Sequence, residues 1–457
     1  MGRTRRYRVR FANSTTFNVP SKELRLATTD DQTAPSRSRT TCYSCRVRHI
    51  KCDEKFPVCT QCSAKGLVCT PKGRPTQWQL EIPWLHSREL VAMPGVNRRL
   101  LQYWLVNVCQ VMTLDPDNNP MSFPMVEQFA NSEALVHSLQ SVSAGYEFFY
   151  DPIRISTSIE ERGKALYAIR QEIQSSTAVR VQSFLAVWML GISSQWIDYS
   201  VSVFGQEHLM AARSILDGLL QQSDFPADHP FRPMIVGAFI WWDMACSLLV
   251  DPSKQKPLDT PEIYSAVISL RGTFCTLVSH ATELFYHLCC LGRYCRALLE
   301  FGTKDLDFED HIEQELLLWE HSSEAEPLML LNESFRLHGM IMLYSLCHRN
   351  VGIDSEDYIR NCSRTILHNI SQISTDSPLF KFFTIPLLSA GAELSDHDQL
   401  LRTQVVEWFA VLYSLSRLPT NKWATELLCD LWARKDAGEQ INWLQLMVQK
   451  GWALMLG

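Results

Sequence analysis

The chain has 457 residues, of which 46% are hydrophobic, and a net charge of −6. This length allows two or three domains with a sizeable buried core. No apolar run approaches the roughly 20 residues of a membrane-spanning helix, and the basic start lacks the apolar core of a secretory signal. Residues 1–75 carry 16 Lys and Arg against 5 Asp and Glu, which leaves −17 on the rest. Such a basic end is typical of a segment that binds a polyanion.

Residues 1–40 are polar and contain Pro20 and Pro35 among scattered serine and threonine residues. Such a composition buries too little apolar surface to fold alone, so we predict a disordered basic arm. Five of its first ten residues are arginines, a density typical of nuclear-import signals and of contacts to nucleic acid.

Six cysteines follow with the spacing C-x2-C-x6-C-x6-C-x2-C-x6-C. A C-x2-C step allows two thiolates to bind one ion, and structural zinc takes four ligands tetrahedrally. Six thiolates give two ions four ligands each only when two sulfurs are shared, so the pattern predicts a cluster of two Zn²⁺ ions. The predicted ligands are Cys42, Cys45, Cys52, Cys59, Cys62 and Cys69. A disulfide framework is disfavoured because no secretory signal precedes the cysteines.

This spacing, the basic stretch after Cys45 and Pro57 in the loop before Cys59 resemble the fungal binuclear zinc cluster transcription factors. The resemblance implies a small metal-stabilised DNA-binding domain at residues 41–72. It also implies that the first and fourth cysteines bridge the ions. Placed on this chain, the shared ligands are Cys42 and Cys59, with Cys45 and Cys52 completing one ion and Cys62 and Cys69 the other. Four sulfurs leave neither ion an open position for water, so the metal is expected to be structural and not catalytic.

The same resemblance implies that a short cationic helix after Cys45 reads a CGG-type triplet of double-stranded DNA in the major groove. The candidate DNA-binding residues are Arg46, Arg48, His49, Lys51, Lys72 and Arg74. We assign base edges to Arg48 and His49 and phosphates to the other four. For each residue assigned to phosphate, the alternative interpretation is a surface charge that is only solvated and contacts no DNA.

His49 departs from the resembled pattern, in which Lys or Arg is usual at this position. Arginine donates two hydrogen bonds to guanine, worth about 1–3 kcal/mol of discrimination, whereas a neutral histidine donates one. The histidine therefore weakens the expectation of a strict CGG preference. A solvent-facing histidine without a role in recognition is the alternative.

Residues 73–96 are rich in proline and glycine, and we interpret them as a linker. Many of the resembled proteins place a coiled-coil helix here, but this segment has no run of heptads. We therefore expect either a homodimer formed through the following domain or a monomer.

Residues 97–457 show apolar residues at helical spacing and few strand-like alternations, so we predict a large all-α domain. After a first helix behind Asn97, helices are expected at 132–150, 158–175, 178–199, 203–222, 230–250, 260–300, 308–321, 328–349, 355–374, 378–394, 398–417, 420–435 and 440–455. The stretches FGQEHLMAARSIL and FIWWDMACSLL resemble the fungus-specific regulatory domain that accompanies zinc clusters. That resemblance implies a domain that regulates activity or mediates association.

Two patterns within the helical part leave alternatives open. Cys289, Cys290 and Cys295 with His287 form either a second metal site or, as their spacing favours, part of an apolar core. The acidic and apolar residues of 304–327 are typical of a transcriptional activation segment, but an amphipathic helix is favoured.

The sequence contains no motif of a hydrolase, a metalloprotease or a nucleotide-binding enzyme, so we expect no enzymatic activity. We predict a nuclear, zinc-dependent, sequence-specific regulator of RNA polymerase II genes that binds DNA and the transcription machinery and no membrane. Control of a metabolic or biosynthetic gene cluster is common among the resembled proteins. The alternative function is a zinc-containing corepressor or scaffold that acts through protein association.

Overall fold

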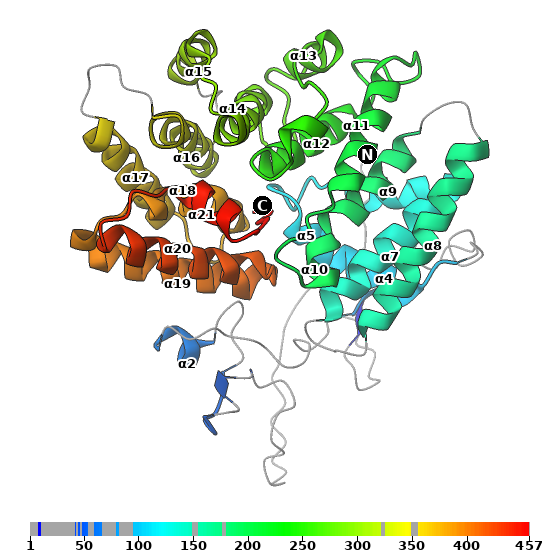
Figure 1. The fold of residues 1–457 in the computed structure, drawn as a ribbon. Coiled ribbons are helices and arrows are strands. Elements are labelled where there is room, and N and C mark those ends of the chain that lie inside the picture. The colour runs from blue at the N-terminus through cyan, green and yellow to red at the C-terminus, as the bar shows by residue number, and fades with distance from the viewer. Residues whose placement is uncertain are drawn as a thin grey trace. The chain divides into compact units, whose positions relative to one another are not determined.

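The structure is a computed structural model of the chain (Figure 1). It describes residues 8–10, 42, 44–45, 48–53, 59–65, 79–81, 95–148, 154–175, 180–320, 325–348 and 355–456. The chain divides into two compact units, Met1–Arg98 and Arg99–Gly457.

The first unit contains the short helix α2 (Thr60–Ser63) and two strands, β1 (Arg8–Arg10) and β2 (Gln79–Glu81). The strands pair antiparallel, with Val9 opposite Leu80. β1 therefore lies within the arm that the sequence predicts to be disordered, and β2 lies within the predicted linker. A ladder of two short strands satisfies its backbone groups but is only marginally stable by itself.

The regular elements of the second unit are helices in its described residues, which confirms the predicted fold class. Its α-helices, counted from the boundary, are α4 (Arg98–Tyr103), α5 (Cys109–Val111), α6 (Phe123–Val126), α7 (Glu133–Phe148), α8 (Arg154–Ser175), α9 (Val181–Ile192), α10 (Ser194–Asp198), α11 (Gln206–Leu220), α12 (Arg232–Cys246), α13 (Pro261–Ile268), α14 (Thr282–Phe301), α15 (Leu306–Leu318), α16 (Glu326–Ile341), α17 (Ser355–Gln372), α18 (Thr384–Ala392), α19 (Gln399–Ser416), α20 (Thr420–Asp436) and α21 (Trp443–Gln449). Single π-helical turns continue α4 at Trp104–Val108 and α16 at Met342–Leu346.

The one helix predicted at 260–300 was wrong, because the chain forms α13 and α14 with a compact turn between them. Gly272 adopts the left-handed conformation at φ 72°, which glycine reaches without steric cost. Beyond it, the backbone N–H of Cys275 donates to the carbonyl of Ser279 at 2.7 Å. These local backbone bonds replace the helical ladder that the apolar periodicity favoured.

The helices of the second unit follow chain order from α7–α9, through α11, α12, α14 and α16, to α17–α20 (Figure 1). The last part of the unit then returns to the first part. The amide of Gln195 donates to the carbonyl of Ala453 at 2.6 Å, and the backbone N–H of Ala453 donates to Val201 at 2.8 Å. Lys381 Nζ donates to the carbonyl of Gln110 at 3.0 Å. We call this contact the seam, made by Gln110, Gln195 and Val201 on one side and Lys381 and Ala453 on the other.

The core is centred on α9 and α12, whose sequences are mostly apolar. A helix of this composition must be surrounded by other helices, and Trp188 of α9 and Trp242 of α12 are fully buried. Gly191 allows the two helices to approach, because a Cβ atom there would lie 2.2 Å from the Trp242 ring. Among the described residues, no helix has the length and apolar character needed to cross a membrane.

Candidate metal centre and nucleic-acid interface

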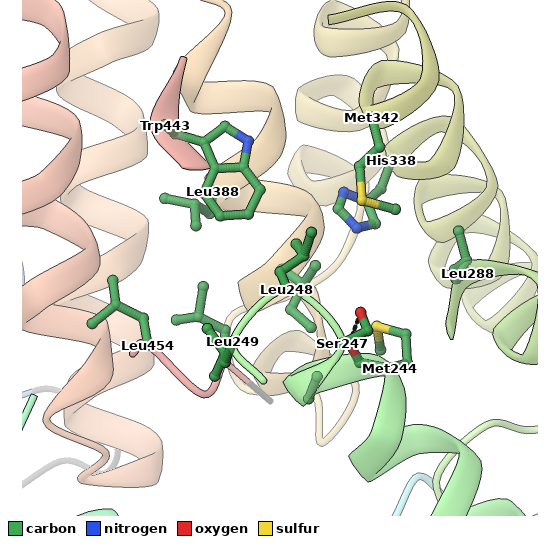
Figure 2. A pocket seen from close by; sticks show the side chains of 13 residues that line it. Met244, Ser247, Leu248, Leu249, Leu288, His338, Met342, Leu388, Trp443 and Leu454 are labelled. Carbon is green, nitrogen blue, oxygen red and sulfur yellow. Dashed lines mark hydrogen bonds between the residues drawn. The ribbon is translucent and has the colours of Figure 1, made fainter. Parts of the chain in front are cut away.

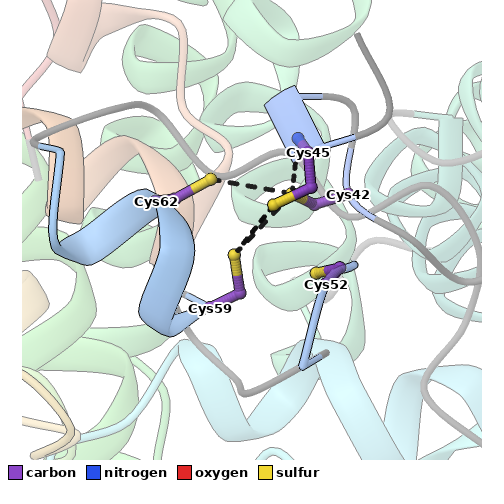
Figure 3. Packing of buried hydrophobic residues seen from close by; sticks show 5 residues of the cluster. All are labelled: Cys42, Cys45, Cys52, Cys59 and Cys62. Carbon is purple, nitrogen blue, oxygen red and sulfur yellow. Dashed lines mark hydrogen bonds between the residues drawn. The ribbon is translucent and has the colours of Figure 1, made fainter. Parts of the chain in front are cut away.

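Five of the six predicted zinc ligands are described, and their sulfurs converge on one point (Figure 3). The ligand atoms of Cys42, Cys45, Cys52 and Cys59 all lie within 4.8 Å of one another. Cys62 joins this group, since its Sγ lies 3.6 Å from that of Cys42. All five side chains are buried. The sixth ligand, Cys69, lies outside the described residues.

Each C-x2-C pair is held by a helical turn that places its two sulfurs on the same side. The backbone N–H of Cys45 donates to Cys42 Sγ at 3.3 Å, and that of Ile50 donates to the Cys45 carbonyl at 3.1 Å. In the second pair, the backbone N–H of Cys62 donates to the Cys59 carbonyl at 2.9 Å at the start of α2. Residues three apart on a helical turn share a face, which explains why this spacing suits a single ion.

The donor set fits zinc. Thiolate is a soft ligand that selects zinc over hard cations, and four sulfurs complete a tetrahedral shell. Burial and the neighbouring thiols of Cys42 and Cys59 raise the pKa of Cys45 to about 12. A bound dication acts in the opposite direction, because coordination removes the thiol proton. Zinc supplies the attraction that holds these sulfurs together as thiolates.

A contact that sequence reasoning missed joins the two halves of the cluster. The carboxylate of Asp53 accepts a hydrogen bond from the backbone N–H of Thr60 at 3.0 Å, and a second bond from the Thr60 hydroxyl. The acceptor thus satisfies a free N–H group at the first turn of α2, as a capping side chain does. The seven-residue separation matches no local capping pattern, so only the folded cluster brings the two residues together.

The predicted cationic helix after Cys45 is described only in part. Arg48 is half-buried, and its Nη2 donates to the carbonyl of Gln61 at 3.2 Å. Its Nε and Nη1 atoms are shielded from solvent without a hydrogen-bond partner among the described residues. His49 and Lys51 are exposed, and His49 ends the turn with a left-handed φ of 53°.

The other three predicted DNA contacts, Arg46, Lys72 and Arg74, lie outside the described residues, so their placement stays a prediction.

The cysteines of the helical unit belong to its core. In the part of the chain that the structure describes, the cluster around Cys42 is the one group arranged to hold a metal. Cys289 Sγ instead donates to the carbonyl of Ile240 at 3.2 Å. The Sγ atoms of Cys295 and Cys347 lie 3.4 Å apart. Burial raises the pKa of Cys289 well above its ordinary value. These residues fit the apolar-core alternative.

The acidic segment contains α15, whose buried face carries Ile312 and Leu316. Glu309 is also buried, and its carboxylate accepts a hydrogen bond from the Tyr294 hydroxyl at 2.7 Å. α15 is thus an amphipathic helix packed on α14 and α16.

Comparison with known families finds a matching family model for each of the two units. Residues 40–79 match the fungal Zn(2)-Cys(6) binuclear cluster domain. Residues 99–457 match the fungal specific transcription factor domain. Because the second match covers most of the chain, the protein belongs to the fungal-specific transcription factor family, with a Zn(2)-Cys(6) cluster in front. The resemblance of this sequence to the fungal zinc cluster transcription factors is therefore confirmed.

The curated relatives match only short stretches of this chain, and these stretches cover less than a tenth of each relative. Transcriptional regulatory protein pro1 of Neurospora crassa is 57% identical over 42 residues, which is 9% of this chain and 6% of the relative. Transcription activator AMTR1 of Alternaria alternata is 57% identical over 35 residues, 8% of this chain and 4% of the relative. Pestheic acid cluster transcriptional regulator 3 of Pestalotiopsis fici is 43% identical over 44 residues, which is 10% of this chain and 8% of the relative. No solved structure matches the chain.

Family membership establishes the broad function. The binuclear cluster binds two zinc ions, as the six cysteines predicted, and a cluster of this type implies DNA binding. The chain belongs to a family of transcription factors and not to a family of enzymes, and membership of this family implies a nuclear location.

Proposed function

We propose that the protein is a zinc-dependent, sequence-specific regulator of RNA polymerase II genes that reads a CGG-like triplet in the major groove. The convergence of four buried thiols within 4.8 Å carries the proposal. A cluster of this kind makes a rigid support for the exposed turn that holds His49 and Lys51. A rigid cationic segment is suited to enter the major groove.

In this proposal Cys42 and Cys59 bridge the two ions, with Cys45 and Cys52 on the first ion. Cys62 and Cys69 complete the second. The Sγ distances of 3.8 Å between Cys42 and Cys59 and 3.6 Å between Cys42 and Cys62 support this division, because a shared sulfur must lie close to the ligands of both ions.

Arg48 and His49 contact base edges, and Arg46, Lys51, Lys72 and Arg74 contact phosphates. The His49 side chain is exposed, so it can contact a base edge without a change of conformation. Arg48 exchanges its hydrogen bond to the Gln61 carbonyl for hydrogen bonds from its guanidinium to guanine O6 and N7. An arginine that forks onto guanine contributes about 1–3 kcal/mol of discrimination, more than the about 1 kcal/mol of an ordinary hydrogen bond.

We further propose that the protein controls a metabolic or biosynthetic gene cluster, acts in the nucleus and recruits the transcription machinery. One matched relative is named as the regulator of a pestheic acid cluster, although that likeness covers only 44 residues. The protein binds either as a monomer or as a homodimer joined through the helical unit.

Selection of bound duplexes from a random DNA library by the full-length protein tests the proposal. We expect enrichment of sites with a CGG-like triplet and loss of binding when a strong chelator removes zinc. Arg48→Ala should flatten the preference among duplexes, whereas Lys72→Ala should weaken all duplexes alike. Retention of zinc without any enriched site would instead support a corepressor or scaffold.

A further inference from the structure

A cavity lies at the seam of the helical unit, with about 730 Å³ of space between protein atoms, a volume that includes open solvent. Its lining comes from both sides of the seam, with Trp188 and Trp196 from the first part of the unit and Lys381, Phe382 and Met455 from the last part. Pockets at such junctions are common ligand sites because both walls contribute binding groups.

Aromatic side chains make up five of the fifteen that line this cavity. Tyr146, Trp188, Trp196 and Trp241 line it, and the rings of Tyr146 and Trp196 meet edge to face with centroids 5.9 Å apart. Aromatic walls favour a flat apolar body that can stack or make edge contacts. They select against a sugar or a peptide, whose many polar groups would lose their hydrogen bonds to water.

Lys381 is the charged side chain among the residues that line this cavity. Its Nζ donates to the Gln110 carbonyl at 3.0 Å and lies 5.4 Å from the centre of the Phe382 ring. Within the described part of the chain it has no carboxylate partner. The side chain as a whole is half-buried, yet burial of its ammonium end lowers the pKa of Lys381 to about 7. An ammonium desolvated without a counter-ion is a ready site for an anion.

Two indole nitrogens in the same wall also lack partners. Trp188 and Trp196 are buried, and their Nε1 atoms make no hydrogen bond to any described residue. A buried donor without an acceptor destabilises the folded protein. A ligand oxygen near either ring would remove that cost.

A second cavity shows what sets the seam cavity apart (Figure 2). It lies between Leu248, His338, Met342 and Trp443, with about 410 Å³ of space that includes open solvent. Burial lowers the pKa of His338 to about 3, so the imidazole there is neutral at physiological pH. No cationic group in this second cavity is available to balance an anion.

We propose that the seam cavity binds a small aromatic carboxylate, with its ring between the indole walls and its carboxylate accepting hydrogen bonds from Lys381 and an indole N–H. The ligand contacts both sides of the seam, so it stabilises the joined arrangement of the first and last parts of the unit. This inference is independent of which DNA site the cluster reads.

The test compares two probes of equal size on the full-length protein, 1-naphthoate and the uncharged 1-naphthalenemethanol, by titration calorimetry and thermal unfolding. We expect 1-naphthoate to bind more tightly and to raise the unfolding temperature. Lys381→Met should weaken 1-naphthoate about tenfold or more, since a hydrogen bond to a charged group is lost. The same variant should change binding of 1-naphthalenemethanol less than about twofold.

Lys422→Met is the matched control, because Lys422 Nζ lies over the Tyr413 ring at 4.2 Å and not in the cavity. This control should bind both probes as the unchanged protein does. Leu277→Trp fills the cavity from a buried lining position and should abolish binding of both probes. The proposal is overturned if 1-naphthoate does not bind, or if Lys381→Met affects both probes equally. If Lys381→Met does not fold, undiminished binding to Leu277→Trp overturns it instead.

Discussion

The Sγ atoms of Cys42 and Cys59 lie 3.8 Å apart, although 17 residues separate them in the chain. Because a bridging thiolate belongs to both ions, its removal should disturb both. We expect Cys59→Ser to leave fewer than one zinc ion per chain, measured by elemental analysis of the purified protein. Cys429→Ser, a change at an exposed cysteine of the helical unit, should retain both ions. Full zinc content in Cys59→Ser would contradict the bridging assignment.

Asp53 should support the cluster without binding metal. Its carboxylate holds the Thr60 backbone N–H at 3.0 Å, and groups that orient ligands commonly change metal affinity by about 10–100-fold. We expect Asp53→Ala to lower zinc affinity by about tenfold in competition with a coloured chelator. Lys65→Ala, at an exposed position after α2, is the control and should leave the affinity unchanged. Equal affinities in both variants would show that the Asp53 contact is dispensable.

The close approach of α9 and α12 should not tolerate a larger residue at Gly191. An added Cβ there would lie 2.2 Å from the Trp242 ring, and overpacking of this kind costs about 1–3 kcal/mol. Gly191→Ala should lower the free energy of unfolding accordingly in denaturant titrations. At the exposed helical position Gly163 nothing lies within 4 Å of such a Cβ. Gly163→Ala should therefore be neutral or stabilise by up to about 1 kcal/mol. Equal effects of the two changes would rule out the packing explanation.

His338 should make the helical unit less stable in mild acid. Burial lowers its pKa to about 3 in the folded protein, whereas an unfolded histidine titrates near ~6.5. Below ~6.5 the unfolded chain therefore takes up a proton that the folded chain does not, and stability falls by about 1.4 kcal/mol per pH unit. This loss is absent at higher pH.

Replacement of His338 by glutamine should reduce that pH dependence. Between pH ~6.5 and ~5.5 the free energy of unfolding of His338→Gln should fall by about 1 kcal/mol less than that of the unchanged protein. His397→Gln changes a histidine whose side chain is 92% exposed and should keep the original slope. Identical slopes for all three proteins would contradict the neutral state of His338.

A buried ion pair between α12 and α14 should contribute strongly to stability. Arg293 forks onto Asp243 with distances of 2.5 and 3.0 Å, and the Asp243 side chain is 3% exposed. Asp243→Ala leaves the arginine charge buried and should cost about 3–5 kcal/mol. The pair of exposed Arg271 with half-buried Glu283 is the comparison, and Glu283→Ala should cost less than about 1 kcal/mol. If Asp243→Ala and Glu283→Ala lowered stability against thermal unfolding by similar amounts, burial would not explain the contribution of the Asp243 ion pair.

The cysteine spacing was enough to predict the zinc cluster because the chemistry is local. Each C-x2-C pair lies on one helical turn, and the metal requires a fixed number of sulfurs. Local reasoning failed at 260–300, where the apolar periodicity continues across the turn between α13 and α14. It also missed the Asp53 contact to Thr60, which depends on the two halves of the cluster meeting.

The amino-acid sequence by itself determined the metal, its two-ion count and the helical character of the larger unit, since ligand spacing and apolar periodicity act over a few residues. The tertiary structure alone decided which cysteines are core residues. It also decided that the Lys381 ammonium group is buried and which tryptophans lie around it. Those properties depend on Gln110, Trp188 and Lys381, which are far apart in the chain. They come together only when the last helices pack against the first, and no local pattern encodes that contact.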